Sequence, residues 1–346
     1  MRWDMLSAPP DALVPDGPAP AAPPLPLALP GAVARTFATP AFAGMTFYEV
    51  RAKSIINRVP GTSRMSFEWT INPYRGCSHA CQYCFARNTH TYLDLDAGHD
   101  FDTKVIVKVN AGELVRRELA APRWRGAHIA MGTNVDCYQR AEGRYRLMPQ
   151  ILAALRDFAN PFSILTKGTL ILRDLELLRQ AASVTEVGLA MSVGFVDETV
   201  WRSVESGTPS PRRRLDAVRA LTDAGFRVTV LMAPILPGLT DTDESIETTV
   251  AAIAAAGGAS VTPIPLHLRP GAKEWYAAWL TREHPALAPL YRRLFQRGSY
   301  SPKEYQREVT ARVRLAARRH GLERPEPGEA RRLPVPPPPP EQLTLL

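Results

Sequence analysis

The sequence has no apolar run that approaches the roughly 20 residues of a membrane-spanning helix, so we expect no membrane partner. Cysteine is scarce: four in 346 residues cannot form the disulfide framework of a secreted protein. The first residues also lack the pattern of a signal peptide, because Asp4, Asp11 and Asp16 interrupt them and prolines begin at Pro9. We therefore expect a cytoplasmic protein.

Apolar residues are plentiful, at 45% of the chain, which excludes a wholly disordered protein. The length suits one large domain or two small ones. Proline is concentrated at both ends of the sequence, with ten of its 33 residues in 1–40 and eight in 325–340. Pro/Ala-rich segments favour solvated, extended conformers over a packed core. We expect disordered tails over 1–40 and 325–346, and a folded region over about 41–324.

Short apolar β-rich runs alternate with helix-period stretches inside this region, which is typical of βα units around a parallel sheet. The predicted strands are Phe67–Asn72, Val105–Val109, His128–Thr133, Phe162–Thr166, Glu186–Val193, Arg227–Ala233 and Val261–Leu268. The predicted helices are Ala111–Leu119, Leu147–Ala159, Leu170–Ala182, Arg213–Ala224 and Glu244–Ala256. The pattern becomes wholly helical over 281–321. The fold class is α/β, and periodicity leaves open whether the sheet is an open barrel or doubly wound.

Three of the four cysteines lie within eight residues, directly after the first predicted strand: Cys77, Cys81 and Cys84, spaced C-x3-C-x2-C. Three thiolates on one loop can ligate three irons of a cubane [4Fe–4S] cluster, which leaves the fourth iron open to a small molecule. A structural zinc site would need a fourth protein ligand, such as His79 or His90. Three incidental buried cysteines are the remaining alternative.

This spacing, with an aromatic residue before the last cysteine, resembles the radical S-adenosylmethionine superfamily. The surrounding motifs are similar to the branch that contains spore photoproduct lyase and its relatives of the DNA repair photolyase type. The segments that carry this resemblance are Asn72–Arg87, Gly132–Glu142, Leu165–Gly168 and Glu205–Asp241.

The resemblance implies a partial (β/α)6 TIM-like barrel over 41–280, followed by a basic helical extension over 281–324. It implies a [4Fe–4S] cluster and S-adenosyl-L-methionine as cofactors, and an electron donor such as flavodoxin or ferredoxin. The chemistry implied is reductive cleavage of S-adenosylmethionine to a 5′-deoxyadenosyl radical, which abstracts hydrogen from a substrate.

The resemblance also assigns residues to the nucleotide. Tyr83 packs near the adenine, Lys167 pairs with the methionyl carboxylate, and Ser192 lies near the ribose. The alternatives are an ordinary aromatic plug, a solvated lysine and a serine that bonds its own backbone. Further cofactor-binding candidates are Asp136, Glu142, Glu205 and Arg214, for which loop capping or a solvated helix start are the alternatives.

Cys137 stands where relatives of this branch most often carry proline. Spore photoproduct lyase uses a cysteine in the same loop region to return a hydrogen atom to a product radical. Cys137 is therefore a candidate catalytic hydrogen-atom donor, and the alternative is a small apolar substitute for proline.

The C-terminal region carries most of the net charge of +8, with ten Lys and Arg against three Glu over residues 279–319. Aromatic residues are interleaved with these cations, namely Tyr291, Phe295, Tyr300 and Tyr305. Such a pattern suits a phosphate backbone and stacked bases, so DNA is an expected partner. The alternative is an amphipathic helix packed on the barrel.

The sequence ends in a Gln-Leu-x-Leu-Leu peptide after a polyproline spacer, formed by Gln342, Leu343, Leu345 and Leu346. It resembles the peptide by which bacterial DNA-processing proteins bind the replication sliding clamp, although that motif usually ends Leu-Phe.

Three functions remain open at this point. The first is a lyase-like radical enzyme that acts on nucleic acid, for instance on a DNA lesion. The second is the same class of enzyme acting on a peptide, RNA or a small metabolite, and the third is a zinc-stabilised nucleic-acid-binding protein without catalysis.

Overall fold

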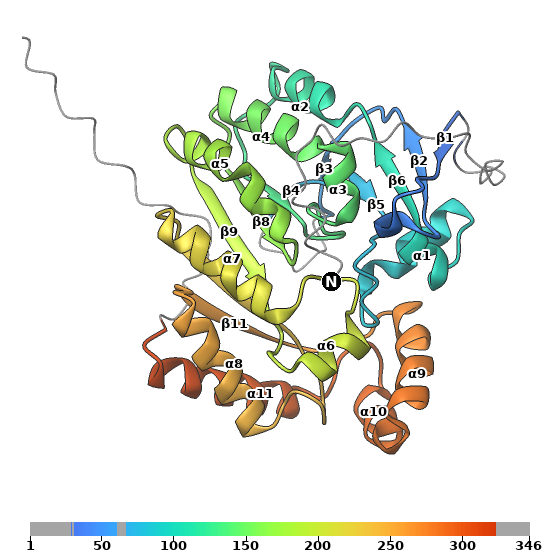
Figure 1. Cartoon of the computed structure of the whole chain (residues 1–346), viewed down its shortest axis with the longest axis vertical. Helices are drawn as coiled ribbons and strands as arrows, with labels where there is room; N and C mark the ends of the chain where they lie inside the picture. The colour runs from blue at the N-terminus through green and yellow to red at the C-terminus, as the bar shows by residue number, and fades with distance from the viewer. Residues whose placement is uncertain (1–28, 30, 61–66, 323–346) are drawn as a thin grey trace, which may run out of the picture.

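The computed structural model describes residues 29, 31–60 and 67–322, which form two sheets covered by helices (Figure 1). The larger sheet has seven strands in the order β11-β10-β9-β8-β7-β4-β3. These are β3 (Ile56–Arg58), β4 (Trp69–Ile71), β7 (Ile129–Met131), β8 (Phe162–Thr166), β9 (Val187–Ser192), β10 (Val228–Ile235) and β11 (Ser260–Pro265). All neighbours from β4 to β11 pair in parallel, and β3 pairs antiparallel with β4 at the edge.

The six parallel strands follow one another in space in their order along the chain. A doubly wound sheet reverses this order at a switch point, whereas a (β/α) barrel does not. The order therefore confirms the α/β fold class as a partial barrel and decides the question that periodicity left open.

Helices connect these strands and cover the outside of the sheet (Figure 1). They are α3 (Arg140–Tyr145), α4 (Leu147–Asp157), η4 (Thr169–Asp174), α5 (Leu175–Ala182), α6 (Glu198–Val204), α7 (Pro211–Asp223) and α8 (Asp243–Ala255). Local chemistry sets their ends: the Ser210 side chain accepts from the backbone N–H of Arg213 at the start of α7, and Gly225 follows its end at φ +94°. Each predicted helix is present within a few residues.

A second sheet, of order β1-β2-β6-β5, corrects one prediction. Its strands are β1 (Val33–Arg35), β2 (Thr46–Val50), β5 (Tyr74–Arg75) and β6 (Lys104–Lys108), with η2 (Pro40–Phe42), η3 (Phe85–Leu93), α1 (His99–Thr103) and α2 (Ala111–Leu119) around them. The predicted strand Val105–Val109 is β6, which pairs with β2 and β5 and not with the barrel strands. An apolar run predicts a strand, but it does not identify the partner of that strand.

The prediction of a disordered tail over 1–40 is wrong for its last residues. β1 pairs antiparallel with β2, which brings Val33 opposite Glu49 and Arg35 opposite Phe47. This stretch contains no proline between Gly31 and Thr39, so its backbone donors are free to pair. Residues 325–346, including the terminal peptide, lie outside the described residues.

The C-terminal region is helical, as predicted, through α9 (Ala272–Glu283), η5 (Pro285–Leu287), α10 (Ala288–Phe295) and α11 (Lys303–Arg319). The predicted domain boundary at residue 280 falls inside α9. The buried face of α11 carries Val309, Val313 and Ala316, and this helix packs against α8 and β11. Within the described ranges, no helix combines the length and apolar composition needed to cross a bilayer.

Two cores result. The main core lies between the barrel sheet and its helices, and a second apolar cluster joins α9 and α10 to the cysteine loop. In this second cluster, Cys81 and Tyr83 lie with Trp279, Tyr291 and Phe295. The C-terminal helices thus form the back wall of the loop that carries the cysteines.

Candidate active site

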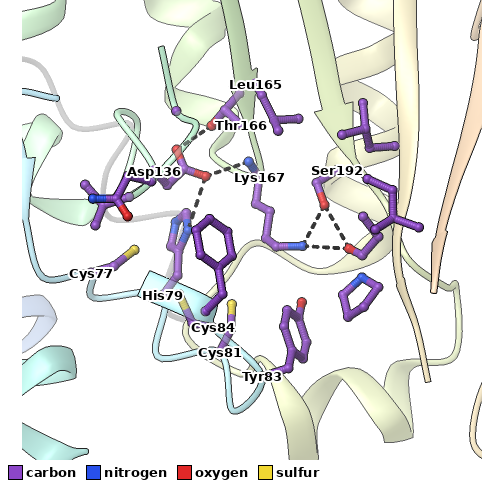
Figure 2. A pocket seen from close by; sticks show the side chains of 18 of the residues that line it. Cys77, His79, Cys81, Tyr83, Cys84, Asp136, Leu165, Thr166, Lys167 and Ser192 are labelled. Atoms are coloured by element: carbon purple, nitrogen blue, oxygen red, sulfur yellow. Dashed lines mark hydrogen bonds and ion pairs between the residues drawn. The ribbon is translucent and has the colours of Figure 1, made fainter. Parts of the chain in front are cut away.

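The parallel strands end at one cavity of about 210 Å³, which is shown in Figure 2. Lys167 follows β8, Ser192 ends β9, Ala233 lies near the end of β10, and His267 follows β11. The cysteine loop, between β5 and η3, forms the opposite wall. The C-terminal edge of a parallel barrel sheet is where ligands bind in proteins of this architecture.

Cys77, Cys81 and Cys84 all line this cavity. Cys77 and Cys81 are buried and Cys84 is half-buried. Burial raises the pKa of each of the three thiols, so their thiolates require a nearby positive charge such as iron. In the part of the chain described, no three His, Cys, Asp or Glu side chains converge on a single metal ion. Three thiols that line one cavity fit a cubane cluster, in which each sulfur binds a different iron.

The two histidines considered as a fourth zinc ligand make other contacts. Nε2 of His90 hydrogen-bonds the backbone O of Lys104 at 2.8 Å. Nδ1 of His79 lies 3.4 Å from Oδ2 of Asp136. The three thiols are a complete set of protein ligands for a cubane cluster, whereas a closed zinc site would also need Nε2 of His79.

The backbone of the cysteine loop is held from the next barrel unit by Gln139, which is fully buried. Its Oε1 accepts from the backbone N–H of Ser78 at 2.9 Å, and its Nε2 donates to the backbone O of Gly76 at 2.9 Å. Gly207 contacts the same loop so closely that a Cβ would lie 2.5 Å from the backbone O of His79. Only glycine fits at this position, which gives a physical reason for the glycine within the motif segment Glu205–Asp241.

Replacing Gln139 by alanine is expected to lower the free energy of unfolding by about 2 kcal/mol, because it leaves a buried N–H and a buried C=O without partners. Iron content after anaerobic reconstitution should fall as well, since the loop loses its clamp. Urea unfolding and iron analysis measure both. The matched control is Gln180→Ala on the exposed face of α5. Wild-type stability and iron content in Gln139→Ala would contradict the clamp.

Arg87 holds the loop from the other side, and its side chain is fully buried. Its guanidinium donates to the backbone O of Cys81 at 2.9 Å and to the carboxylate of Asp102 at 2.9 and 3.0 Å. It also lies 4.7 Å from the ring centroid of Trp275. A buried arginine with these partners fixes the position of Cys81.

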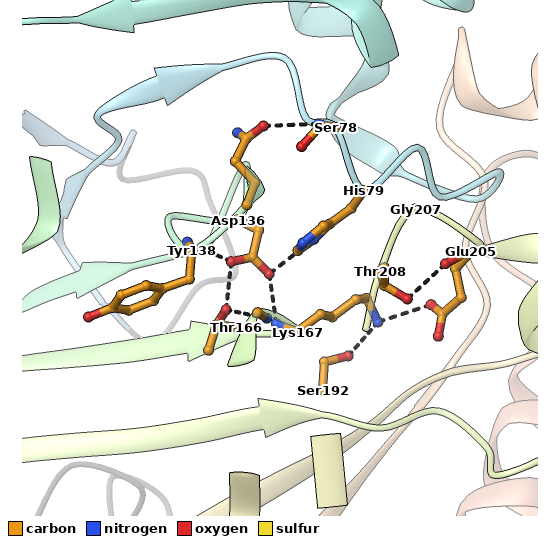
Figure 3. A network of polar contacts seen from close by, with 12 residues as sticks. Ser78, His79, Asp136, Tyr138, Thr166, Lys167, Ser192, Glu205, Gly207 and Thr208 are labelled. Carbon is orange, nitrogen blue, oxygen red and sulfur yellow. Dashed lines mark hydrogen bonds and ion pairs between the residues drawn. The ribbon is translucent and has the colours of Figure 1, made fainter. Parts of the chain in front are cut away.

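Asp136 joins the ends of β7 and β8 to the cysteine loop (Figure 3). Its carboxylate accepts hydrogen bonds from the backbone N–H of Tyr138 at 2.9 Å and from the hydroxyl of Thr166 at 2.6 Å. It also accepts from the backbone N–H of Lys167 at 2.7 Å and lies beside His79. Burial raises the pKa of Asp136, but the charge and hydrogen bond of His79 outweigh this and lower it. Asp136 therefore stays ionised.

Lys167 belongs to a second network with four other predicted residues, of which Figure 3 shows Ser192 and Glu205. Its Nζ donates to the hydroxyl of Ser192 at 2.7 Å and lies 3.4 Å from Oε2 of Glu205. Glu205 also accepts hydrogen bonds from Tyr83 and from the buried Arg214. Burial raises the pKa of Glu205, but the charges of Arg214 and Lys167 outweigh it and lower the pKa to about 2.

The structure thus brings Tyr83, Asp136, Lys167 and Ser192 to the cavity wall. Behind this wall lie Glu205 and Arg214, which hold Tyr83, Lys167 and Ser192 in place.

Glu142 and Cys137 lie elsewhere, which corrects the expectation for both. The carboxylate of Glu142 is buried and bonds the hydroxyl of Tyr74 at 2.5 Å, Arg173 at 2.6 Å and the first backbone N–H groups of α4. Cys137 is fully buried among the apolar side chains of the main core. Burial raises the pKa of the Cys137 thiol. Both residues have structural roles here. The position of Cys137 fits the alternative that it is a small apolar substitute for proline.

Sequence reasoning did not assign several wall residues to the nucleotide site, and it named His79 only as a possible zinc ligand. The His79 ring is 2% exposed and lines the cavity, and its Nε2 has no hydrogen-bond partner within the described ranges. Phe85 and His267 line the cavity too. A signal existed for both: Phe85 follows Cys84 directly, and His267 lies just after β11, whose end meets the ends of the other parallel strands.

Comparisons with known proteins agree with this geometry. A family model described as the Radical SAM superfamily matches residues 71–251. An uncharacterized protein of Mycobacterium tuberculosis (strain ATCC 25618 / H37Rv) is 48% identical over 316 residues, 89% of this chain and 93% of its own. An uncharacterized protein of Methanocaldococcus jannaschii is 30% identical over 197 residues, 56% of this chain and 70% of its own.

Solved structures of spore photoproduct lyase have a similar fold. The enzyme complexed with dinucleoside spore photoproduct gives a TM-score of 0.58 at 16% identity and covers 79% of both chains. A variant with bound AdoMet and the same dinucleoside gives a TM-score of 0.58, at 16% identity, and covers 79% of this chain and 78% of its own. At 16% identity, this structural similarity shows a shared fold and nothing more.

Proposed function

We propose a reaction for this chain from the premise that it belongs to the Radical SAM superfamily, to which its residues 71–251 match. It is a radical SAM enzyme whose cofactors are a [4Fe–4S] cluster and S-adenosylmethionine. When bound, these cofactors supply a 5′-deoxyadenosyl radical that abstracts a hydrogen atom from a substrate. The proposal is that this substrate is a nucleic acid, DNA rather than RNA, and that the reaction is lyase-like, as in repair of a DNA lesion.

One observation carries the assignment of the cluster site: Cys77, Cys81 and Cys84 line one cavity at the C-terminal edge of the barrel sheet. Their thiolates hold the three protein-bound irons in the proposal. Gln139 and Arg87 keep the loop backbone in place by the hydrogen bonds described above.

Lys167 is the proposed partner of the methionyl carboxylate. Lys167 lines the cavity, its side chain is 13% exposed, and its Nζ lies beside Ser192 (Figure 2). Ser192 and Tyr83, which its Nζ contacts, are then placed for the ribose and the adenine. Asp136 holds the backbone of Lys167, so its role in the proposal is to orient the β8 end rather than to bind the nucleotide.

Much of the remaining wall is apolar. Apolar side chains form part of it, among them Val135, Leu165, Leu231, Ala233, Ile264 and Leu266. A primary carbon radical reacts with whatever lies within contact distance, so a dry wall and a fixed substrate protect the reaction.

Two features support a nucleic-acid substrate. The net charge is +8, and most of the excess falls in the C-terminal helices. The fold is similar to that of spore photoproduct lyase, which has been solved with a dinucleoside spore photoproduct. The sliding-clamp contact through Gln342 and the leucines after it, the flavodoxin or ferredoxin donor and the cytoplasmic location stay predictions.

The proposal is tested with anaerobically reconstituted protein, reductant and S-adenosylmethionine. We expect 5′-deoxyadenosine to form, and irradiated DNA to be converted in the same assay. A colourless protein that binds zinc and forms no 5′-deoxyadenosine would contradict the enzyme class. Turnover of a peptide, RNA or small metabolite without any action on DNA would contradict the substrate.

Alanine at Lys167 is expected to weaken binding of S-adenosylmethionine about tenfold or more, because one charge-assisted hydrogen bond is worth about 1.5–3 kcal/mol. Equilibrium dialysis with the reconstituted protein measures the affinity. Lys53→Ala, an exposed lysine between β2 and β3, is the matched control. An unchanged affinity in Lys167→Ala would remove Lys167 from the nucleotide site.

A further inference from the structure

A row of three aromatic rings runs from the cavity wall to the surface; we call Phe85, His267 and Tyr300 the ring row. Phe85 and His267 line the cavity, with ring centroids 5.8 Å apart. The His267 ring stacks on that of Tyr300, with centroids 5.5 Å apart and planes at 21°. Tyr300 is 57% exposed, so its outer part faces solvent.

The backbone holds the ring row in place. His267 and Tyr300 form an antiparallel bridge, and the backbone N–H of Leu268 donates to the backbone O of Ser299 at 2.8 Å. Burial, and then the charge of Arg269, lowers the pKa of His267, which keeps the ring neutral at neutral pH. An exposed aromatic held rigidly against a second ring is a ready stacking surface, because little entropy is lost when a further ring is added.

One exposed arginine contacts the ring row, and a second exposed arginine lies close to Tyr300 in the sequence. The guanidinium of Arg269 lies 5.1 Å from the ring centroid of Phe85, and Arg297 lies two residues before Ser299. Over the described ranges, no acidic side chain pairs with either arginine. Cations beside an exposed aromatic ring suit a strand that carries both phosphates and bases.

The positions of the other C-terminal aromatic residues show which of them could stack on a base. The sequence predicted base stacking by Tyr291, Phe295, Tyr300 and Tyr305. Tyr291 and Phe295 are buried in the second apolar cluster. Tyr305 is half-buried, and its hydroxyl donates to the carboxylate of Asp241 at 2.8 Å. Of the four, Tyr300 alone is exposed, and it is the one that leads to the cavity.

We propose that the ring row and its two arginines bind a single-stranded or locally unstacked nucleic acid at the entrance to the radical site. One base passes Phe85 and His267 toward the cavity, a neighbouring base stacks on Tyr300, and the arginines pair with phosphates. This rests on the proposed nucleic-acid substrate and names the surface that recognises it. A base in a closed duplex cannot reach a buried cavity, which is why the strand must present it unstacked.

The test is binding of a fluorescein-labelled oligodeoxythymidylate of about 12 nucleotides, followed by anisotropy at several salt concentrations. We expect Tyr300→Ala to weaken binding about tenfold with an unchanged salt slope, and Tyr300→Phe to bind like the wild type. Arg269→Ala is expected to reduce the salt slope by about one. Tyr92→Ala, a tyrosine that is 74% exposed, is the matched control and should bind normally.

Wild-type affinity in Tyr300→Ala, or a loss of the same size in Tyr300→Phe or Tyr92→Ala, would overturn the ring row as a stacking surface. Absence of oligonucleotide binding by the wild type would overturn it as well. Formation of 5′-deoxyadenosine is measured on the same preparations. Because it needs no substrate, normal formation alongside unchanged binding would reject the ring row and leave the radical chemistry standing.

Discussion

Replacing Cys77, Cys81 and Cys84 together by alanine is expected to abolish iron binding and the formation of 5′-deoxyadenosine. The three thiols are the cysteine sulfurs on the cavity wall, and without them a cubane cluster has no protein ligands there. The expected effect is complete loss, measured as iron and sulfide content after anaerobic reconstitution and as 5′-deoxyadenosine formed with reductant.

The fourth cysteine provides the matched control. Cys137 lies in the main core, so Cys137→Ala should keep the full iron content and form 5′-deoxyadenosine at the wild-type rate. Substrate turnover by this variant also decides the hydrogen-donor hypothesis, which the buried position of Cys137 disfavours. Iron retained by the triple variant would refute the cluster site and with it the proposed function.

Replacing Glu205 by alanine is expected to lower the free energy of unfolding by about 3–5 kcal/mol. Glu205 is 1% exposed, and its loss leaves the guanidinium of Arg214 buried without its counter-charge. Tyr83 and Lys167 lose a partner at the same time, so affinity for S-adenosylmethionine should fall as well. Urea unfolding measures the stability.

Glu198→Ala is the control for this prediction, since Glu198 forms an exposed pair with Arg202 on α6. Its effect should stay within about 1 kcal/mol. A Glu205→Ala variant as stable as the control would show that the buried network contributes no stability.

The same residue predicts a pH dependence. The pKa of Glu205 is about 2 in the folded chain against the usual 4.5, so its ionised form is favoured by folding. Its stabilising contribution is complete above pH 4.5 and is lost as the pH falls toward 2. The difference in stability between the wild type and Glu205→Gln should therefore shrink with acidification over this range.

Much of the fold could be predicted from the sequence because hydrophobic periodicity reports burial directly. β8 has the predicted bounds, Phe162–Thr166, and the other barrel strands differ by a few residues. The cysteine loop was also predictable, because the three thiols proposed to bind one cluster lie close together in the sequence. Pairing between distant segments was not: nothing in the apolar run of β6 indicates that it joins β2 rather than β4.

The site was predicted in part for the same reason. Lys167 and Ser192 stand where β8 and β9 end, and strand ends of a parallel sheet meet at one edge. Cys137 lies in the loop after β7 and Glu142 in α3, which follows it, and sequence position does not tell which of these side chains turn outward and which join the core. Likewise, an aromatic residue among arginines on a helix has the same sequence pattern whether it stacks on a ligand or, as Tyr291 does, fills the interior.

The second apolar cluster has a consequence for how the chain can be divided. Cys81 and Tyr83 share that cluster with Trp279, Tyr291 and Phe295, which belong to α9 and α10. A truncated fragment that stops after β11 would retain every thiol and the whole parallel sheet. It would, however, expose to water the side of the cysteine loop that packs against α9 and α10. The packing of the cysteine loop therefore depends on the longer chain, and shortened versions of the protein should be cut no earlier than the end of α10.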